Sequence, residues 1–339
     1  MHTEPARKGD LVTLTDGTLT EEGARQMLEG IRFPNGLHCI FPDCGGADVY
    51  RLEVKAKTYE PTAKYPKGRT VGPRSLYKCK ACRRQFSVTK GTIFEDSKIP
   101  LRTWIVVMYR MCSSKKGVSA LQIQREFGLS YESAWFMCHR IRYAMQDKNP
   151  LALSGTIEAD ETYIGGKAKN MHKARREAVI KGRGAVGKTP LVGMVERGGR
   201  VRTQVMQPTR DNLEAFLLKN MDTNASRLMT DEASGYDRIG AHLPHSVIRH
   251  SSEYVRGEVY TNTIESYWAT LKRGLIGTFH QVDAGYLPMY AHEFEFRYNS
   301  RKVKDAVRFA SLLGQVDGRL DWYLGQNAAS ASEETDQPL

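Results

Sequence analysis

The sequence predicts a mixed α/β protein in which a small cysteine-bearing β module and a helical segment precede a larger domain. Three observations support this prediction. Two pairs of cysteines lie among alternating apolar and polar residues in the N-terminal third. The pattern then changes to helical spacing over residues 101–145. Beyond residue 150, strand patterns and amphipathic helices are interleaved, which is typical of a mixed sheet flanked by helices.

The composition indicates a globular protein with an excess of positive charge. Of its 339 residues, 40% are hydrophobic and 26% are charged. Lys and Arg number 50 against 38 Asp and Glu, and the net charge of +12 suits a polyanionic partner such as nucleic acid or a merely basic protein. The sequence has no apolar run long enough to span a bilayer and begins with no secretory signal pattern. We therefore expect a cytoplasmic protein.

Both ends of the chain are polar. Residues 1–30 contain one short helical pattern, and residues 326–339 (QNAASASEETDQPL) have the composition of a disordered tail. The organised part of the chain is therefore expected between them.

A zinc ribbon is predicted over residues 31–97. Its ligands would be Cys39 and Cys44 in HCIFPDCGG, with Cys79 and Cys82 in YKCKACRRQF. Four thiolates suit a closed, tetrahedral and therefore structural Zn²⁺ site, and a disulfide is disfavoured without an export signal. The first pair is wider than the common CxxC, so His38 is an alternative to Cys39, and four unrelated thiols are the other interpretation.

Two helices joined by a short turn are predicted within residues 98–148, after the helical pattern LRTWIVVMYRMC. VSALQIQREFG is followed by a turn at Gly128 and Leu129, and Ser130 is placed to cap YESAWFMCHRIRYAM. This is the outline of a DNA-binding helix-turn-helix, whose second helix would present Arg140 and Arg142. An αα-hairpin in a core has the same pattern.

Two aspartates occupy strand positions after a linker at Asn149 and Pro150. Asp160 lies in TIEADETYIGG, and Asp231 follows the apolar strand pattern SRLM. Carboxylates on adjacent strands can lie side by side. Strand alternation directs Glu161 to the opposite face, whereas Glu158 shares the face of Asp160 and is not excluded by this argument.

TNTIESYWATLKRG predicts an amphipathic helix. The apolar stripe expected to pack on the sheet consists of Ile264, Trp268, Leu271 and Leu275. Glu265 and Lys272 lie two turns apart on a polar stripe that also holds Asn262. Asn262 and Glu265 fit a capping box as well, although capping does not explain Asp231 and Lys272 in the same arrangement.

With these segments identified, the chain resembles the DDE-type insertion-sequence transposases with an N-terminal zinc ribbon and an RNase H-like catalytic core. The matching segments are EADETYIGG, MTDEASGY, TNTIESYWATLKRG and EFEFRYNSR, and the resemblance covers roughly residues 35–315. It implies an RNase H-like catalytic domain over residues 152–315. It also implies that Asp160, Asp231 and Glu265 are the catalytic acids, with Asn262 as the alternative third residue because some relatives use Asn.

The resemblance implies metal-dependent DNA cleavage and strand transfer at the terminal inverted repeats of an insertion sequence. The three acids would supply the oxygen ligands that two Mg²⁺ or Mn²⁺ ions require. Lys272 would contact phosphate near the scissile bond, with Arg273 beside it. The expected partners are transposon-end and target DNA, bound by a homodimer or higher oligomer of a bacterial-type, nucleoid-associated protein.

GRGAVGKTP, residues 182–190, has the spacing of a phosphate-binding P-loop. A P-loop opens a helix, whereas Pro190 and the β-rich LVGMVE follow here. We therefore predict no ATPase activity. The segment is better interpreted as a loop whose Arg183 and Lys188 contact the DNA backbone, or as a solvated hairpin connection.

Two other functions fit the same residues. One is a metal-dependent nuclease without strand transfer, and the other is a zinc-ribbon DNA-binding regulator whose acids are structural. Cleavage of DNA that carries the element's ends would separate the enzymes from the regulator, and joined products would separate transposase from nuclease.

Overall fold

The computed structural model describes residues 18–63, 66–71, 74–166, 171–179, 186–231, 234–248 and 260–320. The chain divides into two compact units, one formed by Met1–Tyr109 with Phe309–Arg319 and the other by Arg110–Arg308 with Leu320–Leu339. The sequence-based division separates the helix-turn-helix region from the catalytic domain, whereas both predicted helices of that region lie in the second unit together with the domain. The predictions for Arg183 and for the tail at 326–339 fall outside the described residues.

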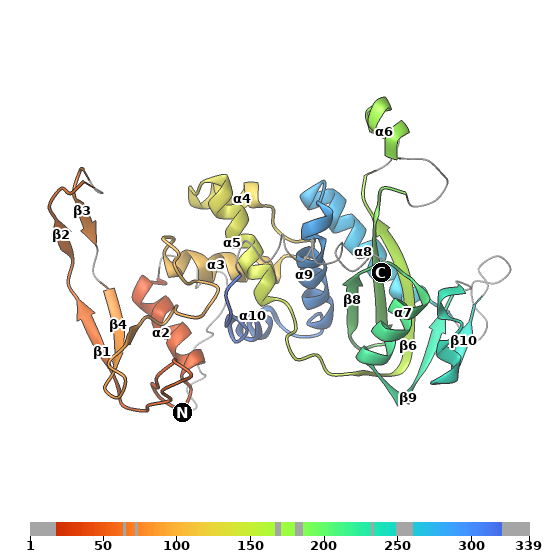
Figure 1. Cartoon of the computed structure of the whole chain (residues 1–339), viewed down its shortest axis with the longest axis horizontal. Coiled ribbons are helices and arrows are strands. Elements are labelled where there is room, and N and C mark those ends of the chain that lie inside the picture. The colour runs from red at the N-terminus through yellow and green to blue at the C-terminus, as the bar shows by residue number, and fades with distance from the viewer. Residues whose placement is uncertain are drawn as a thin grey trace, which may run out of the picture. The chain divides into compact units, whose positions relative to one another are not determined.

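The first unit contains a small antiparallel sheet (Figure 1). Its strands are β1 (Val49–Val54), β4 (Arg74–Cys79) and β5 (Gln85–Phe86), in the order β1-β4-β5. Helix α2 (Glu21–Arg32) begins at Thr20, whose hydroxyl oxygen accepts a hydrogen bond from Gly23 N at 3.0 Å. β2 (Lys57–Tyr59) and β3 (Arg69–Val71) pair separately as a two-stranded sheet.

Helix α3 (Leu101–Ser113) begins in this unit, and a carboxylate from α2 satisfies its first backbone N–H groups. Glu21 accepts hydrogen bonds from Leu101 N at 2.7 Å and Arg102 N at 3.0 Å. The negative charge also lies at the positive end of the helix dipole, which stabilises the helix start.

The second unit begins with the predicted helix pair, α4 (Ala120–Phe127) and α5 (Tyr131–Ala144). Gly128 adopts the left-handed conformation with φ of 63°, which glycine tolerates without a Cβ clash, and this ends α4. Ser130 caps α5 as predicted, because its side chain accepts a hydrogen bond from Ser133 N at 3.2 Å.

A five-stranded mixed sheet forms the centre of the second unit. Its order is β10-β9-β6-β7-β8. Three antiparallel strands come first, β6 (Leu153–Ile164), β7 (Thr189–Glu196) and β8 (Val201–Val205), and β9 (Met221–Thr230) and β10 (His245–Val247) are then added in parallel pairing beyond β6. This arrangement, with helices on the sheet, confirms the predicted mixed α/β fold and is consistent with an RNase H-like domain.

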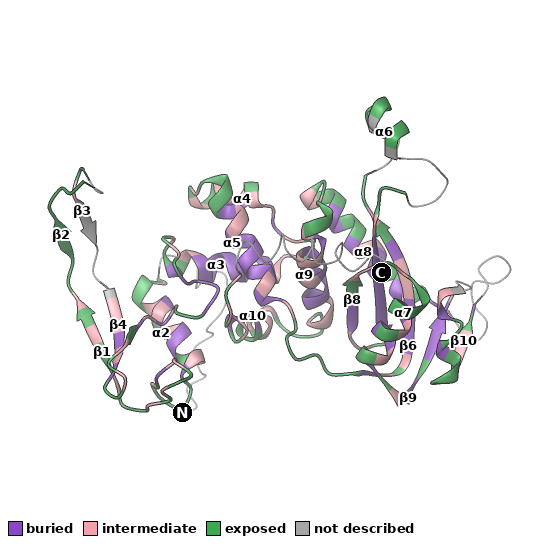
Figure 2. Cartoon of the chain, viewed as in Figure 1, coloured by how far each residue is buried: buried purple, intermediate pink, exposed green. Residues whose placement is uncertain are grey.

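Helices cover both faces of this sheet, and its central strands are buried (Figure 2). On one face, α7 (Arg210–Asn220) packs through Leu213, Phe216 and Leu217 against Ile157 and Ala159 of β6. On the other, α8 (Asn262–Gly274) and α9 (Leu287–Asn299) pack on β7 and β8. No helix among the described residues is long and apolar enough to cross a membrane.

The helical region predicted from Thr261 to Tyr298 is interrupted. α8 continues as a π-helical turn (Leu275–Phe279), and His280 then takes a positive φ of 62°, which ends it. A short 3₁₀ turn (Ala284–Tyr286) leads into α9. The remaining helices of the unit are α6 (Lys173–Val179), two 3₁₀ turns (Ser234–Tyr236 and Ile239–Ala241) and the start of α10 (Asp305–Leu313).

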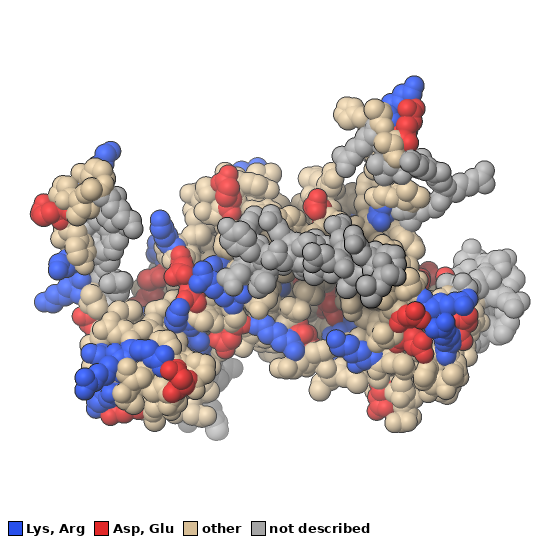
Figure 3. Space-filling view, in the orientation of Figure 1, with Lys and Arg blue, Asp and Glu red and all other residues tan. Residues whose placement is uncertain are grey.

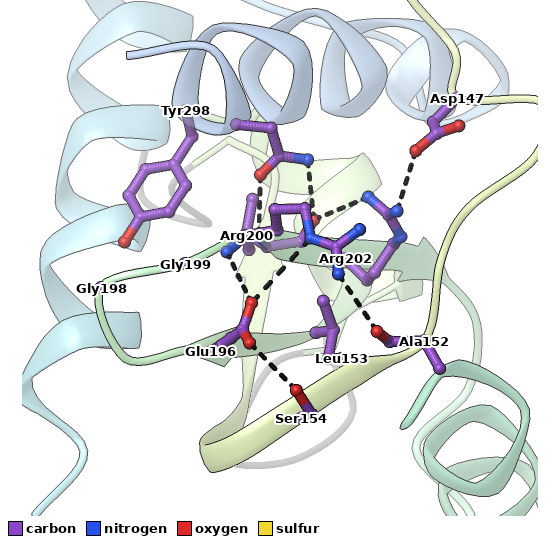
Figure 4. Close-up of polar contacts among 12 residues, drawn as sticks. Asp147, Ala152, Leu153, Ser154, Glu196, Gly198, Gly199, Arg200, Arg202 and Tyr298 are labelled. Atoms are coloured by element: carbon purple, nitrogen blue, oxygen red, sulfur yellow. Dashed lines mark hydrogen bonds and ion pairs between the residues drawn. The ribbon is translucent and has the colours of Figure 1, made fainter. Parts of the chain in front are cut away.

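The edge strand β8 is held by α9 and by the segment before β6. Asn299 acts as a substitute strand partner, because its side-chain oxygen accepts from Val201 N at 2.7 Å and its amide donates to Val201 O at 3.1 Å. Figure 4 shows the neighbouring contacts, in which Arg202 pairs with Asp147 at 2.8 Å and Arg200 donates to Ala152 O at 3.1 Å. The start of this edge strand is therefore covered, which limits pairing with another strand at that point.

Arg142 forms a buried ion pair instead of the predicted DNA contact. Its Nε lies 2.6 Å from Glu293 Oε2, and the two side chains are 2% and 0% exposed. Arg297 pairs with the same carboxylate and donates to Met111 O at 2.9 Å. Arg140 is also buried, with its guanidinium 4.7 Å from the Phe136 ring centroid. The prediction that Arg140 and Arg142 contact DNA is therefore wrong, because this part of α5 faces the protein interior.

We expect Glu293→Gln to lower the unfolding free energy of the second unit by about 3–5 kcal/mol, because it leaves a buried guanidinium unpaired. Burial alone would raise the pKa of Glu293, but Arg142 and Arg297 hold it below its usual value. The contribution is therefore present above the unfolded carboxyl pKa of about 4.3 and is lost as pH falls through the folded pKa. Urea unfolding of wild type and variant across this pH range measures it.

Arg238→Met is the matched control. Arg238 pairs with Asp211 at 2.7 Å, but the side chains are 54% and 84% exposed. Its loss should cost less than about 1 kcal/mol. Equal losses of unfolding free energy in the two variants would show that the buried Glu293 pair stabilises the protein no more than an exposed pair does.

Candidate active site and metal centre

The four predicted zinc ligands converge in the first unit. Their Sγ atoms all lie within 4.8 Å of one another, with Cys39 to Cys82 and Cys44 to Cys79 both at 3.7 Å. A tetrahedral site with Zn–S bonds of about 2.3 Å requires sulfur–sulfur distances of about 3.8 Å. The two distances that join the first pair to the second match this value, and these four thiols form a site of the kind that binds zinc.

Neighbouring groups support this ligand set. His38 is exposed, with Nδ1 3.2 Å from Gly36 O, and it is not among the clustered ligand groups. A hydrogen bond from Arg84 lowers the pKa of Cys82 to about 6, which favours the thiolate that a metal requires. Arg84 is itself held by Asp43 at 2.6 Å.

The two predicted catalytic aspartates lie side by side in the second unit. β6 and β9 are parallel, with Ile157 opposite Leu228 and Glu158 opposite Met229. Two residues further along the same register, Asp160 in β6 is level with Asp231, which directly follows β9. Carboxylates at these two positions can lie side by side at the ends of neighbouring strands, and their assignment as catalytic acids stays a prediction.

Trp268 of α8 holds the first carboxylate. Its Nε1 donates a hydrogen bond to Asp160 Oδ2 at 3.0 Å. The indole reaches this position because Gly193, the cross-strand partner of Asp160 in β7, has no side chain. A Cβ on Gly193 would lie 2.6 Å from the Trp268 ring. Any side chain at residue 193 would therefore displace the indole from Asp160.

Helix α8 carries the predicted third acid, Glu265, on its exposed face. The buried stripe of Ile264, Trp268, Leu271 and Leu275 faces the sheet. Glu265, Lys272 and Asn262 are all exposed. The Thr261 hydroxyl donates to Glu265 Oε1 at 3.1 Å, so the carboxylate is oriented at the start of the helix.

The three carboxylates are close enough to repel one another. Burial raises the pKa of Asp160 to about 6, and the charges of Asp231 and Glu265 add to this effect. Among the described residues, the cysteines form the only group of three or more potential ligands that is tightly clustered. The acids therefore share an electrostatic environment without the close contact of the thiols.

Glu158 has a role that sequence reasoning missed. It is fully buried, and its Oε2 accepts hydrogen bonds from Thr263 N at 2.8 Å and Ile264 N at 3.1 Å. Its Oε1 accepts from Arg197 Nε at 2.6 Å and from the Thr263 hydroxyl at 2.8 Å. A carboxylate of β6 thus caps α8 and satisfies its orphan N–H groups.

This cap replaces the capping box considered for Asn262 and Glu265. The residue at the N-cap is Thr261, and Asn262 is the first residue of the helix. Because Glu158 takes the N–H groups of Thr263 and Ile264, the Glu265 side chain is not needed for capping. The face shared by Glu158 and Asp160 was the available signal, but the partner lies 105 residues further along the chain.

The other acid beside Asp160 faces the opposite side of the sheet. Burial raises the pKa of Glu161 to about 7, with the charges of Asp160 and Asp231 adding to the effect. The Tyr236 hydroxyl opposes this rise. Tyr236 belongs to the buried cluster under α7, so Glu161 points into that core. The strand-alternation argument that set it apart is consistent with this position.

The remaining predicted DNA contacts are on the surface. Lys188, Lys272 and Arg273 are exposed, and the Arg273 guanidinium donates to the Thr270 hydroxyl at 3.2 Å. The P-loop-like segment continues directly into β7 at Thr189, so it leads into a strand and not into the helix whose N-terminus would bind phosphate. This agrees with the interpretation of the segment as something other than a P-loop.

Comparison with known proteins identifies the protein family. Residues 19–85 match the transposase zinc-ribbon domain, and residues 152–299 match the ISXO2-like transposase domain. A protein of transposable element ISH50 from Halobacterium salinarum is 28% identical over 291 residues, which is 82% of this chain and 91% of that protein. The two domain matches together cover well over half of the chain. The protein belongs to this family of insertion-sequence transposases.

We expect Cys79→Ser or Cys82→Ser to release zinc and unfold the ribbon, because small metal-bound modules lack a sufficient core of their own. Zinc per chain, measured by elemental analysis, should fall with loss of ribbon structure. Cys112→Ser is the control, since this thiol is buried in α3 away from the cluster. Wild type that contains no zinc, or a Cys79 variant that retains it, would contradict the assignment.

We expect Glu158→Gln to destabilise the second unit by about 3 kcal/mol, because an amide cannot accept all four hydrogen bonds and leaves Arg197 without its buried counter-charge. Thr209→Ala is the matched control. It removes an ordinary cap, that of α7, in which the Thr209 hydroxyl accepts from Asn212 N at 3.3 Å, and should cost about 1 kcal/mol. Urea unfolding measures the free energy of unfolding of both variants. Equal losses would show that Glu158 stabilises the unit no more than an ordinary helix cap does.

Proposed function

We propose that this transposase cleaves DNA at the ends of its insertion sequence and joins the released 3′ ends to target DNA. The proposal is supported by the parallel register of β6 and β9, which on extension by two residues would bring Asp160 level with Asp231, and by the charges of Asp231 and Glu265, which add to the raised pKa of Asp160. Three carboxylates from two strands and a helix are a suitable ligand set for hard divalent cations.

The reaction is two in-line displacements at phosphorus. Water first attacks a phosphodiester and releases a 3′ hydroxyl, and that hydroxyl then attacks a target phosphodiester, so one P–O bond forms as another breaks in each step. Two bound Mg²⁺ ions would stabilise the attacking and leaving oxygens. Asp160, Asp231 and Glu265 would hold them, and no covalent enzyme intermediate is needed.

The surroundings suit a polyanionic substrate. Glu265 and Lys272 are exposed on the same face of α8, two turns apart, so a phosphate near the acids would lie within reach of the lysine. Lys272 would contact this phosphate, and Arg273 and Lys188 would add backbone contacts. The zinc site would be structural, since four protein thiolates leave no open position.

The experiment uses duplexes that carry the inverted repeats flanking the gene. Purified protein should give Mg²⁺-dependent nicks at the repeat ends and products joined to a second duplex. Nicks without joining would make the protein a nuclease, and binding without either product would make it a regulator. Gel shifts in the presence of competitor DNA test end recognition, and size measurements on the complex test the expected homodimer or higher oligomer.

Glu265→Gln is expected to reduce cleavage by orders of magnitude with nearly unchanged stability. The substitution removes the charge that a metal ligand requires, but retains an oxygen for the Thr261 hydroxyl. Glu158 continues to cap the helix. Cleavage rates at several Mg²⁺ concentrations and thermal melting measure the two effects.

Asn262→Ala is the companion variant, because Asn262 is the alternative third ligand. It is exposed at the first position of α8, so its loss should leave the fold intact and cleavage close to wild type. An active Glu265→Gln beside an inactive, folded Asn262→Ala would transfer the role to Asn262.

A further inference from the structure

A basic arm projects from the ribbon at the end opposite the thiols. We define it by its described residues, 55–63 and 66–71, which lie between β1 and β4 and include β2 and β3. In the β1–β4 ladder, Val49 pairs with Cys79 and Val54 pairs with Arg74. The arm therefore leaves the sheet five residues beyond the cysteine end on each strand, and Figure 1 shows it as the far extension of β1 and β4.

The described side chains of the arm lie outside the hydrophobic core. Its two strands bond only to each other among the described strands, with Lys57 opposite Val71 and Tyr59 opposite Arg69. All three residues of β2 are exposed, and Tyr59 is 45% exposed. None of the arm side chains whose burial is described is buried. A two-stranded ribbon of this kind is marginal in water, so its stability is not the reason for its presence.

The charge of the arm is predominantly positive. Among its described residues the lysines and arginines are Lys55, Lys57, Lys67 and Arg69, and the single acid is Glu60. Lysines and prolines also protect edge strands from aggregation, and those of the arm serve that role too. The excess of positive charge on exposed strands also suits a polyanionic partner. The Lys57 ammonium also lies 5.1 Å from the Tyr59 ring centroid, which keeps it beside an exposed aromatic surface.

We propose that the basic arm inserts into the major groove of duplex DNA. The groove is about 12 Å wide and accepts a two-stranded β-ribbon, and the lysines on either side would reach the flanking phosphates. A protein partner is disfavoured because the described side chains of the arm form no apolar patch that such a partner could bury. The inference rests on the proposed DNA-processing function, although it concerns binding and not cleavage. In Figure 3, Lys and Arg side chains are visible along this ribbon.

The test compares two triple variants of the full-length protein. The arm variant carries Lys55→Gln, Lys57→Gln and Lys67→Gln, and the control variant carries Lys98→Gln, Lys219→Gln and Lys304→Gln, all of them exposed lysines. Both variants have the same reduction in charge. Binding to a short duplex of arbitrary sequence is measured by fluorescence anisotropy over a range of KCl concentrations, without Mg²⁺. Zinc content and circular dichroism should match wild type in both.

The arm variant should reduce the slope of log K against log salt by about 0.9 for each phosphate that the arm no longer neutralises, up to about 2.7, while the control changes it little. Methyl green, which fills the major groove, should abolish the difference between wild type and arm variant, whereas the minor-groove ligand netropsin should not. Equal slopes in the two triple variants, or sensitivity to netropsin alone, would overturn the proposal. A protein that binds in this way but never cleaves would refute the catalytic function and leave the arm's role standing.

Discussion

The buried carboxylate of Glu158 fixes the geometry on which the candidate active site depends. It lies two residues before Asp160 in β6 and bonds the first N–H groups of α8 at 2.8 and 3.1 Å. Trp268 of α8 bonds back to Asp160 at 3.0 Å. Glu265 lies between these two attachment points. The strand that carries the first acid therefore also sets the position of the third, and neither helix shift nor rotation is possible without breaking buried hydrogen bonds.

The segments that resemble the transposase family divide into two physical kinds. Glu265 and Lys272 are exposed and Asp160 is partly exposed, so these side chains can meet a substrate. The downstream segment EFEFRYNSR is mostly internal, since Glu293 balances two arginines and Asn299 completes the edge of β8. The similarity of EFEFRYNSR to the family therefore reflects how α9 supports the sheet. This segment is informative about the fold and not about the reaction.

Local pattern was enough to predict most elements, because periodicity and capping are properties of neighbouring residues. The strand that contains Asp160, the strand that ends just before Asp231, the stripe of α8 and the Ser130 cap were all predicted in this way. The errors concern partners far apart in sequence. The partner of Arg142 is Glu293, 151 residues away, and local pattern cannot reveal it, so Arg142 was assigned to DNA. The capping box was considered for the same reason, because Glu158 lies 105 residues before the helix it caps.

The clustering of acids has a cost that follows from the same geometry. The pKa values of Asp160 and Glu161 are raised to about 6 and about 7, with burial the main cause in each case. A carboxyl whose pKa is raised by folding stabilises the fold while protonated, and this contribution is lost as pH rises through the folded pKa. At neutral pH Asp160 is therefore mostly ionised and Glu161 about half ionised, and the packing of α7 and α8 must offset both the burial of these charges and their repulsion. Divalent cations bound by the proposed ligands would relieve the repulsion, so an arrangement unfavourable for stability is the one that favours metal binding.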